Sequence, residues 1–269
     1  MTTSLRQPSP LRTCLAPGRP AAPGRGARLG ALAYGVLCYA LTLAAFAYLA
    51  GFLGNFLAPT RLDAPGAGSA GVALAVDLAL VALFAVQHSV MARPGWKRLW
   101  TRLVPEPVER STYLLASCLA LAAILAFWRP IGGVVWEVTD PVARGIVLGV
   151  YALGWALLLL ATFLINHFDL FGLRQVWLHA CGRPYTALPF RTPWLYGLVR
   201  HPLYVGWFTV FWAAPTMTVS HLVFAAGMTV YILAAIRWEE RDLVELHPEY
   251  AAYRVRLPKF LPRLRRVAR

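Results

Sequence analysis

An apolar run without a single charged residue, from Leu29 to Ala58, most constrains what this chain can fold into. A transmembrane helix needs about 20 such residues, so this run is long enough to cross a bilayer. It is too long to be the apolar segment of a secretory signal peptide. We therefore expect an integral membrane protein.

The composition agrees with a surface that faces lipid. Hydrophobic residues make up 58% of the 269 residues, and charged residues make up only 14%. Soluble domains carry about 25% charged residues, so too few charges remain here to cover a surface in water. The expected fold class is all-α, a polytopic transmembrane helical bundle, because helices satisfy their own backbone groups in lipid.

Later apolar runs predict a bundle of about six helices that ends in a C-terminal helical hairpin. Asp140 and Pro141 suit the N-cap and the first position of the fourth helix. The fifth helix, which begins at Pro202, is too short to cross a bilayer unaided. The expected ranges are 29–58, 71–91, 112–128, 141–165, 202–214 and 219–238.

The chain divides into a tail and one domain. Residues 1–28 are rich in Pro, Gly and Arg and lack apolar periodicity, so we expect a disordered basic tail. Residues 29–269 would then form a single transmembrane domain.

The distribution of positive charge predicts the orientation of the bundle. The formal net charge is +14, and the Lys and Arg residues lie between the apolar runs. Of the 26 Lys and Arg residues, only Arg61, Arg129 and Arg144 lie in the alternate set of loops. The positive-inside rule therefore places both termini in the cytoplasm, with the basic loops against membrane lipids. Nucleic-acid binding is not expected, because no basic arm or stacking groove is visible.

Neither cysteine nor histidine spacing suggests a metal site. The four cysteines contain no C-x-x-C pair, and no two histidines lie within five residues of each other. Zinc sites and clustered-histidine sites use closer spacings than these. We expect no metal ion.

Polar residues at the ends of two predicted spans are candidates for a functional site, because such residues are rare within a membrane. Gln87 and His88 lie at the end of the second span, and Asn166, His167 and Asp169 follow the fourth. They would form the polar wall of a substrate pocket near the cytoplasm. An ordinary polar helix end explains either group equally well.

The strongest constellation lies on the two arms of the C-terminal hairpin, which would meet at the same cytoplasmic edge. A helix N-terminus at Pro202 can hold a carboxylate, and the glutamates of the second arm can accept hydrogen bonds from hydroxyl groups. A ligand with an amino-acid end and a ribose end suits such a site; the alternative is a helix cap beside a surface ion-pair network. The residues are His201, Tyr204, Gly206, Arg237, Glu239 and Glu240.

These motifs resemble a known family. The pattern R-H-P-x-Y-x-G at 200–206, followed by E-E at 239–240, resembles the isoprenylcysteine carboxyl methyltransferase superfamily of membrane enzymes. The segment 250–258 resembles its Y-x-x-Y-x-x-x-V-P ending, although His-Pro at 247–248 stands where Phe-Gly is usual. The resemblance covers about residues 77–262 and implies a methyltransferase whose cofactor site lies mainly in 200–258.

Within the superfamily, the sequence is most similar to the methanethiol S-methyltransferases. The stretch N-H-F-D-L-F-G-L-R-Q at 166–175 indicates this group, and those at 87–94, 109–113 and 189–193 agree with it. The Q-H-S at 87–89 is also similar to NnrU-like proteins, so that feature alone decides little.

The resemblance implies S-adenosylmethionine as cofactor and methyl donor, and a small thiol, methanethiol, as the acceptor that becomes dimethyl sulfide. It implies that His201, Tyr204, Gly206, Glu239 and Glu240 line the cofactor site, with help from Arg237. Thiolate is the reactive form of a thiol, and histidine titrates near neutrality. The catalytic candidates are therefore His167 and His88 as bases, with Asp169 orienting one of them. The candidate acceptor-binding residues are Gln87, Asn166, Phe168 and Phe171.

Two alternatives stay open. A related enzyme would methylate a larger thiol or a carboxylate, and a small closed aromatic pocket around Phe168, Phe171 and Trp177 would argue against it. A non-catalytic transporter or sensor would not bind S-adenosylmethionine. In either enzyme we expect a multi-pass protein of a bacterial inner membrane, with the site facing the cytoplasm. The sequence does not predict the oligomeric state.

Overall fold

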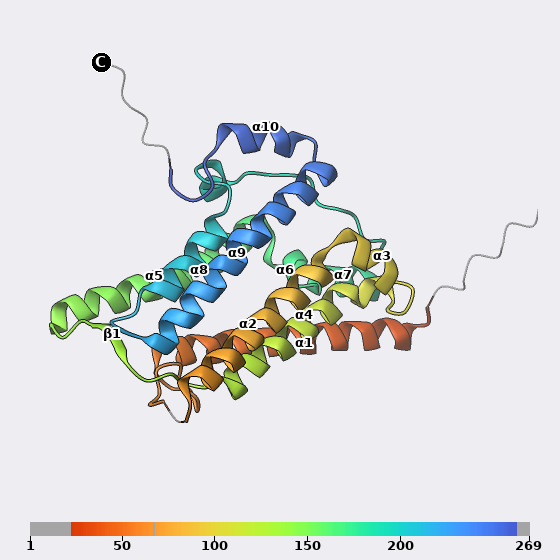
Figure 1. Ribbon diagram of the computed structural model, residues 1–269. Coiled ribbons are helices and arrows are strands. Elements are labelled where there is room, and N and C mark those ends of the chain that lie inside the picture. Colours follow the sequence, from red (N-terminus) through yellow and green to blue (C-terminus); the bar gives the residue numbers. More distant parts are fainter. Residues whose placement is uncertain (1–22, 67, 263–269) are drawn as a thin grey trace, which may run out of the picture.

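The computed structural model describes residues 23–66 and 68–262, and its regular structure is nearly all helical (Figure 1). Within these residues, five helices are long and apolar enough to cross a membrane. They are α1 (Arg25–Gly54), α2 (Ala70–Ala92), α4 (Glu106–Phe127), α5 (Pro141–Ile165) and α9 (Val219–Leu246). The expected all-α polytopic bundle is confirmed, and α8 (Pro202–Trp212) is the short helix expected before the last span.

Local chemistry explains where several helices begin and end. Asp140 caps α5 by accepting a hydrogen bond from the backbone N–H of Ala143 at 2.8 Å, as the sequence predicts. Helix α4 begins at Glu106 rather than Thr112, because a proline and two acidic residues suit its first turn. Helix α9 continues past Trp238, because an apolar run marks the membrane span and not the end of the helix.

Helix α1 begins inside the segment expected to be a disordered tail. Residues 25–28 are already helical, so the expected boundary is wrong there, and residues 1–22 lie outside the described residues. Arg and Ala favour helix strongly, which explains the earlier start. The helix ends before Asn55, which adopts a left-handed φ of 58° and donates its N–H to the carbonyl of Gly51.

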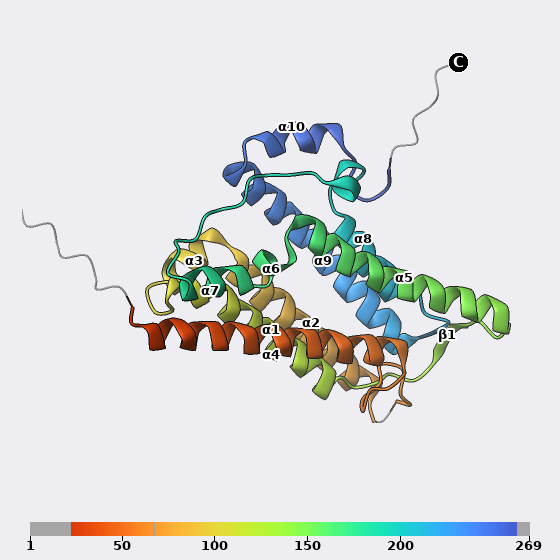
Figure 2. The same ribbon diagram turned by 180° about the vertical axis from the view of Figure 1, so that it is seen from behind.

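The long helices form two groups that α9 joins (Figure 2). Helix α1 packs against α4 and α7 (Leu173–Ala180), and α2 packs against α4, whereas α5 packs mainly against α8. Helix α9 contacts both α2 and α8. Buried side chains from both groups meet in one core, which includes Phe52, Ile124, Leu158, Phe211 and Phe224.

Two glycines hold α8 close to α5. A Cβ on Gly206 would lie 2.9 Å from Cγ of Leu158, and a Cβ on Gly154 would lie 2.9 Å from Cγ2 of Val210. Small residues let helix backbones approach in this way inside membranes. The close contact shields a helix of only 11 residues from lipid along one side.

The short elements lie at the two ends of the bundle (Figure 1). Helices α3 (Pro94–Trp100), α6 (His167–Leu170), α7 and α10 (Glu249–Arg256) lie toward one end, called here the α10 end, together with the 3-10 turn η1 (Trp194–Gly197). At the opposite end, called the strand end, β1 (Val134–Glu137) pairs antiparallel with β2 (Thr216–Thr218). The connection between the helices predicted at 202–214 and 219–238 is therefore partly a strand, which the sequence could not show because the partner strand comes from a distant part of the chain.

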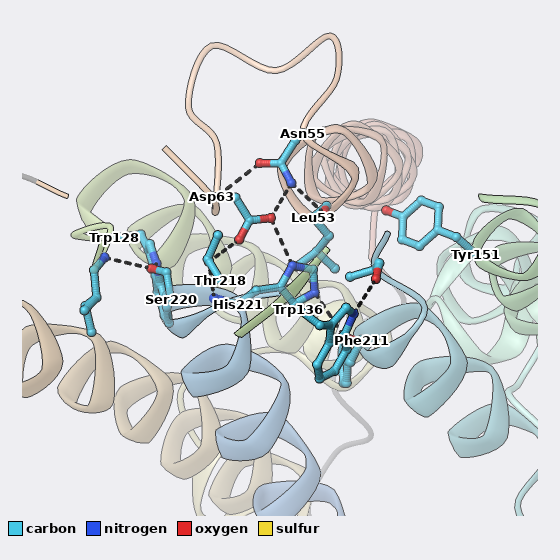
Figure 3. Close-up of polar contacts among 12 residues, drawn as sticks. Leu53, Asn55, Asp63, Trp128, Trp136, Tyr151, Phe211, Thr218, Ser220 and His221 are labelled. Atoms are coloured by element: carbon cyan, nitrogen blue, oxygen red, sulfur yellow. Dashed lines mark hydrogen bonds and ion pairs between the residues drawn. The ribbon is translucent and has the colours of Figure 1, made fainter. Parts of the chain in front are cut away.

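A buried polar cluster joins the elements of the strand end (Figure 3). Asp63 accepts hydrogen bonds from Asn55 and Thr218 and lies 3.1 Å from Nδ1 of His221. Nε2 of His221 donates to the carbonyl oxygen of Phe211 at 3.0 Å. Both ring nitrogens therefore face acceptors, and His221 forms a buried ion pair with Asp63 when the ring is protonated.

The carboxylate of this cluster is held in its charged form. Burial by itself would raise the pKa of Asp63, but the hydrogen bond and charge of His221, with hydrogen bonds from Thr218 and Asn55, hold that pKa below its usual range. Asn55, Asp63, Thr218 and His221 are called the closed-end cluster below. This cluster connects the loop after α1 to the end of α8 and the start of α9.

Candidate active site

The two arms of the hairpin meet at the α10 end, as the sequence predicts. Nε2 of His201 lies 3.0 Å from Oε1 of Glu240, and Nη2 of Arg200 lies 3.0 Å from the same oxygen. One helical turn away, the hydroxyl of Tyr204 donates to Oε2 of Glu239 at 2.5 Å. The first turn of α8 and the two residues before it thus present donors to two consecutive carboxylates of α9.

Donors beside these carboxylates have no partner of their own. Nε of Arg200 and the hydroxyl of Tyr250 are buried, and neither forms a hydrogen bond within residues 23–66 and 68–262. Burial, followed by the charges of Glu240 and Glu239, raises the pKa of Tyr250, so its hydroxyl keeps its proton. Buried polar groups are normally paired, so two unpaired donors here favour a ligand that carries acceptor atoms. Arg200, His201, Tyr204, Glu239, Glu240 and Tyr250 are called the hairpin cluster below.

A central cavity of about 600 Å³ lies between the two groups of helices and reaches the hairpin cluster at Tyr204. Its walls come from α1, α2, α4, α5, α8 and α9, and from α6 with the residue that follows it. Four of the predicted site residues line it, namely His88, His167, Phe171 and Tyr204. Another cavity, of about 780 Å³, opens at the strand end beside Arg61 and Arg144, and no predicted site residue lines it.

His88 is neutral and its proton can be placed. The hydroxyl of Ser117 donates to the carbonyl of Tyr113 at 3.0 Å, so its oxygen accepts from Nδ1–H of His88 at 3.1 Å. Nε2 is then the acceptor for the hydroxyl of Tyr113, at 2.9 Å. This assignment of the proton follows from the hydrogen-bond partners. The guanidinium of Arg110 lies 5.1 Å from the centre of the Tyr113 ring.

His167 has a similar pair of partners. The hydroxyl of Thr162 donates to the carbonyl of Leu159 at 2.7 Å, so it accepts from Nδ1–H of His167 at 2.8 Å. Nε2 accepts from the hydroxyl of Tyr39 at 2.8 Å. Burial lowers the pKa of His167, so the ring is neutral at pH 7.

Comparison with known proteins gives the family. The chain is 52% identical over 232 residues to the methanethiol S-methyltransferase of Crocosphaera subtropica, covering 86% of this chain and 91% of that protein. It is 47% identical over 230 residues to that of Mycobacterium tuberculosis, covering 85% and 94%. The chain belongs to the methanethiol S-methyltransferase family.

A more distant relative is also similar to this chain. The Nurim of Rattus norvegicus is 34% identical over 178 residues, which cover 63% of this chain and 68% of that protein. No family model matches the chain. No solved structure matches it either.

Two of the cofactor candidates of this methyltransferase lie away from the hairpin cluster. Gly206 faces Gly154 and Leu158 of α5, so its missing side chain serves helix packing and not the approach of a ligand. Arg237 is exposed and forms no ion pair within the described residues. The sequence could not separate these functions, because a glycine or an arginine on a helix does not reveal what it faces.

Several candidates from the fourth-span region have structural partners. Asn166 caps α6, with Oδ1 accepting from the backbone N–H of Asp169 at 3.0 Å. Asp169 forms an ion pair with Arg174 at 3.0 Å, and its contacts within the described chain include neither histidine. Asp169 therefore does not orient either candidate base. Gln87 donates weakly at 3.4 Å to Ser117, which lines the central cavity, but Gln87 itself does not line it.

Phe168, Phe171 and Trp177 do not form the small closed aromatic pocket that would have argued against a larger acceptor. Phe168 is 52% exposed and Trp177 is 59% exposed, so only Phe171 of the three faces the central cavity. Residues that the sequence analysis did not single out take their place, namely Arg110, Tyr113, Trp155, Trp207 and Tyr231. Arg110 and Tyr113 lie in the E-R-S-T-Y stretch at 109–113 that carried the resemblance, and this was the one available signal. Trp155, Trp207 and Tyr231 lie in apolar runs.

Proposed function

We propose that this chain transfers a methyl group from S-adenosylmethionine to methanethiol and so produces dimethyl sulfide. The observation that carries the proposal is that the pair His88–Tyr113 lines a mostly apolar cavity that reaches Tyr204, whose hydroxyl donates to Glu239. Membership of the methanethiol S-methyltransferase family supports the choice of reaction.

The hairpin cluster fits the proposed methyl donor. An amino-acid carboxylate needs donors, and Nε of Arg200 and the hydroxyl of Tyr250 are buried without a partner in the described chain. Ribose hydroxyls and an ammonium group need acceptors, which Glu239 and Glu240 supply. When bound, S-adenosylmethionine supplies an electrophilic methyl group on a sulfonium sulfur. Everything else in the reaction is positioning and proton transfer by this chain's own residues.

His88 acts as the base through Tyr113. The S–H proton of the thiol passes to the Tyr113 hydroxyl oxygen as that hydroxyl gives its own proton to Nε2 of His88, 2.9 Å away. The product of this step is a thiolate, which is the nucleophilic form. Arg110 lines the same end of the cavity and has no ion-pair partner in the described part of the chain, so its charge stabilises the thiolate.

His167 is better placed to position a side chain of the cavity wall than to accept the thiol proton. Its Nε2 lone pair already accepts from Tyr39, and its ring stacks on Phe163 with centroids 4.2 Å apart. Tyr39 is not among the residues that line the central cavity. We therefore assign His167 a positioning role for Phe171, whose ring lies 4.7 Å from it.

An apolar thiol enters from the bilayer between α1 and α5. Leu43 and Ala47 of α1 and Ala156 and Leu159 of α5 line the central cavity and are also exposed at the lipid-facing surface. The charged donor enters at the α10 end, which the positive-inside rule places in the cytoplasm. Ala156→Trp should raise KM for methanethiol and leave KM for the donor unchanged. Ala152→Trp, exposed on the same helix but outside the cavity wall, is the matched control.

Headspace gas chromatography tests the reaction directly. Membranes that contain the protein receive S-adenosylmethionine and methanethiol, and a Glu239→Ala, Glu240→Ala double variant is assayed beside them. Dimethyl sulfide from the wild type and none from the double variant is the expected result. Glu245→Ala, an exposed residue of the same helix, is the control that should keep full activity. No product despite intact donor binding would indicate a larger acceptor, and no binding would leave only a non-enzyme.

A further inference from the structure

The central cavity is much larger than methanethiol. A dry cavity of about 150 Å³ lined by Leu, Ile and Phe already holds benzene. The cavity here measures about 600 Å³, whereas methanethiol has only two heavy atoms. A small acceptor would leave most of this apolar volume unfilled.

The unfilled volume is a shaft that runs away from the base toward the strand end. Ser117, which accepts from His88, is seven positions before Ile124 on α4, and Tyr204 is seven positions before Phe211 on α8. Tyr231 is likewise seven positions after Phe224 on α9. Seven residues of helix span about 10 Å, so all three helices extend the cavity by the same depth. Polar groups gather at one end and aromatic or aliphatic side chains line the other.

We infer that this protein also methylates longer apolar thiols, with the sulfur at His88–Tyr113 and the hydrocarbon chain in the shaft. The inference rests on the proposed thiol methylation and names a broader class of acceptor for the same site: primary alkanethiols and compact aromatic thiols. The bond between the donor's sulfur and its methyl carbon breaks, with the electron pair going to the donor's sulfur. A bond forms between that carbon and the thiol sulfur, and the thiol proton passes to His88 through Tyr113. The product is an alkyl methyl thioether.

Chain length should be visible in the kinetics. Burying one methylene is worth a factor of about four in binding, so KM should fall about fourfold per added carbon until the shaft is full. Part of this trend would come from partition of the thiol into the bilayer, which acts on any membrane enzyme. A variant that shortens the shaft separates the two causes, because partition is the same for variant and wild type.

Leu121 is the position for that variant. It lines the shaft on α4 one turn beyond Ser117 and is only 7% exposed. Leu121→Trp would fill the shaft below the base. Leu119→Trp is the matched control, because Leu119 is 65% exposed on the same helix and is not among the residues of the cavity wall.

The experiment measures thioether formation from methanethiol, ethanethiol, butanethiol and hexanethiol in membranes holding wild type, Leu121→Trp or Leu119→Trp. We expect turnover of all four thiols by the wild type. The ratio of variant to wild-type kcat/KM should fall with chain length for Leu121→Trp, at least tenfold more for hexanethiol than for methanethiol. The ratio should stay constant for Leu119→Trp.

The outcomes separate this inference from the proposed function. Turnover of methanethiol without turnover of hexanethiol by the wild type would overturn the inference and leave the proposed function standing. A constant ratio for Leu121→Trp at every chain length would also overturn it, because the shaft would then not hold the chain. Failure with all four thiols would overturn the proposed function itself. The wild-type series stands without the variants, so a variant that fails to fold does not prevent the test.

Discussion

The two buried polar clusters of this protein lie at opposite ends of the same hairpin and differ in one respect. In the closed-end cluster, every buried polar atom of Asn55, Asp63, Thr218 and His221 has a partner. In the hairpin cluster, Nε of Arg200 and the hydroxyl of Tyr250 have none in the described chain. A saturated buried network stabilises one arrangement, whereas buried donors without partners cost stability until a ligand supplies acceptors. The closed-end cluster therefore stabilises the hairpin, whereas the hairpin cluster is the proposed site for the methyl donor.

The largest expected effect comes from breaking the closed-end cluster. His221→Ala leaves the buried charge of Asp63 unpaired, which costs about 3–5 kcal/mol. The melting temperature in detergent should fall steeply, while KM for the donor in the protein that remains folded should not change. Replacing both members, Asp63→Leu with His221→Leu, should recover much of the loss. A raised donor KM with an unchanged melting temperature would reverse the roles assigned to the two clusters.

A ligand should stabilise the protein through the hairpin cluster. S-adenosylhomocysteine, the product form of the donor, should raise the free energy of unfolding by about 2.7 kcal/mol at a hundred times its Kd. The thermal shift should persist in Asp63→Leu/His221→Leu and disappear in Glu239→Ala/Glu240→Ala. Equal shifts in both variants would mean that the donor binds elsewhere.

Removing an unpaired hydroxyl should have opposite effects on binding and stability. Tyr250→Phe deletes a buried donor that has no partner, so the melting temperature should stay the same or rise. KM for the methyl donor should increase about tenfold, the value of one hydrogen bond to a charged group. The control is Tyr253→Phe on the same helix, which loses a 2.6 Å hydrogen bond to the Tyr196 carbonyl. It should lower stability by about 1 kcal/mol and leave donor KM unchanged.

The smallest expected effect is on how the stability of the protein depends on pH. Burial lowers the pKa of His167 from its usual value near 6.5, so the folded protein binds fewer protons than the unfolded chain below that pH. Stability should therefore fall as the pH drops below about 6.5 and should not depend on this group above it. The melting temperature of His167→Gln should fall less steeply over the same range. Parallel curves would show that the pKa of His167 is the same in the folded and the unfolded protein.

The sequence by itself determined the number and order of the long helices and the meeting of the hairpin arms. These features depend on local signals: runs of apolar residues long enough to span, caps such as Asp140, and motif spacing across a short hairpin. The motifs also indicated the family that the relatives later showed. Each of these signals is contained in one stretch of chain.

Only the tertiary structure decided which face of each helix lines the central cavity, and with it the partners of the site. A helix that is apolar on every side has no stripe to mark its inner face, so the roles of Tyr113, Trp155 and Leu121 could not be predicted. Asp63 and His221 are far apart in the sequence, and a single chain does not reveal that they pair. The sequence suggested that Gly206 belongs to a ligand site, because it does not show that Gly206 packs against Gly154 and Leu158 of α5. In lipid, helices associate through side-chain packing and not through the hydrophobic effect. Packing partners are defined only in the assembled bundle.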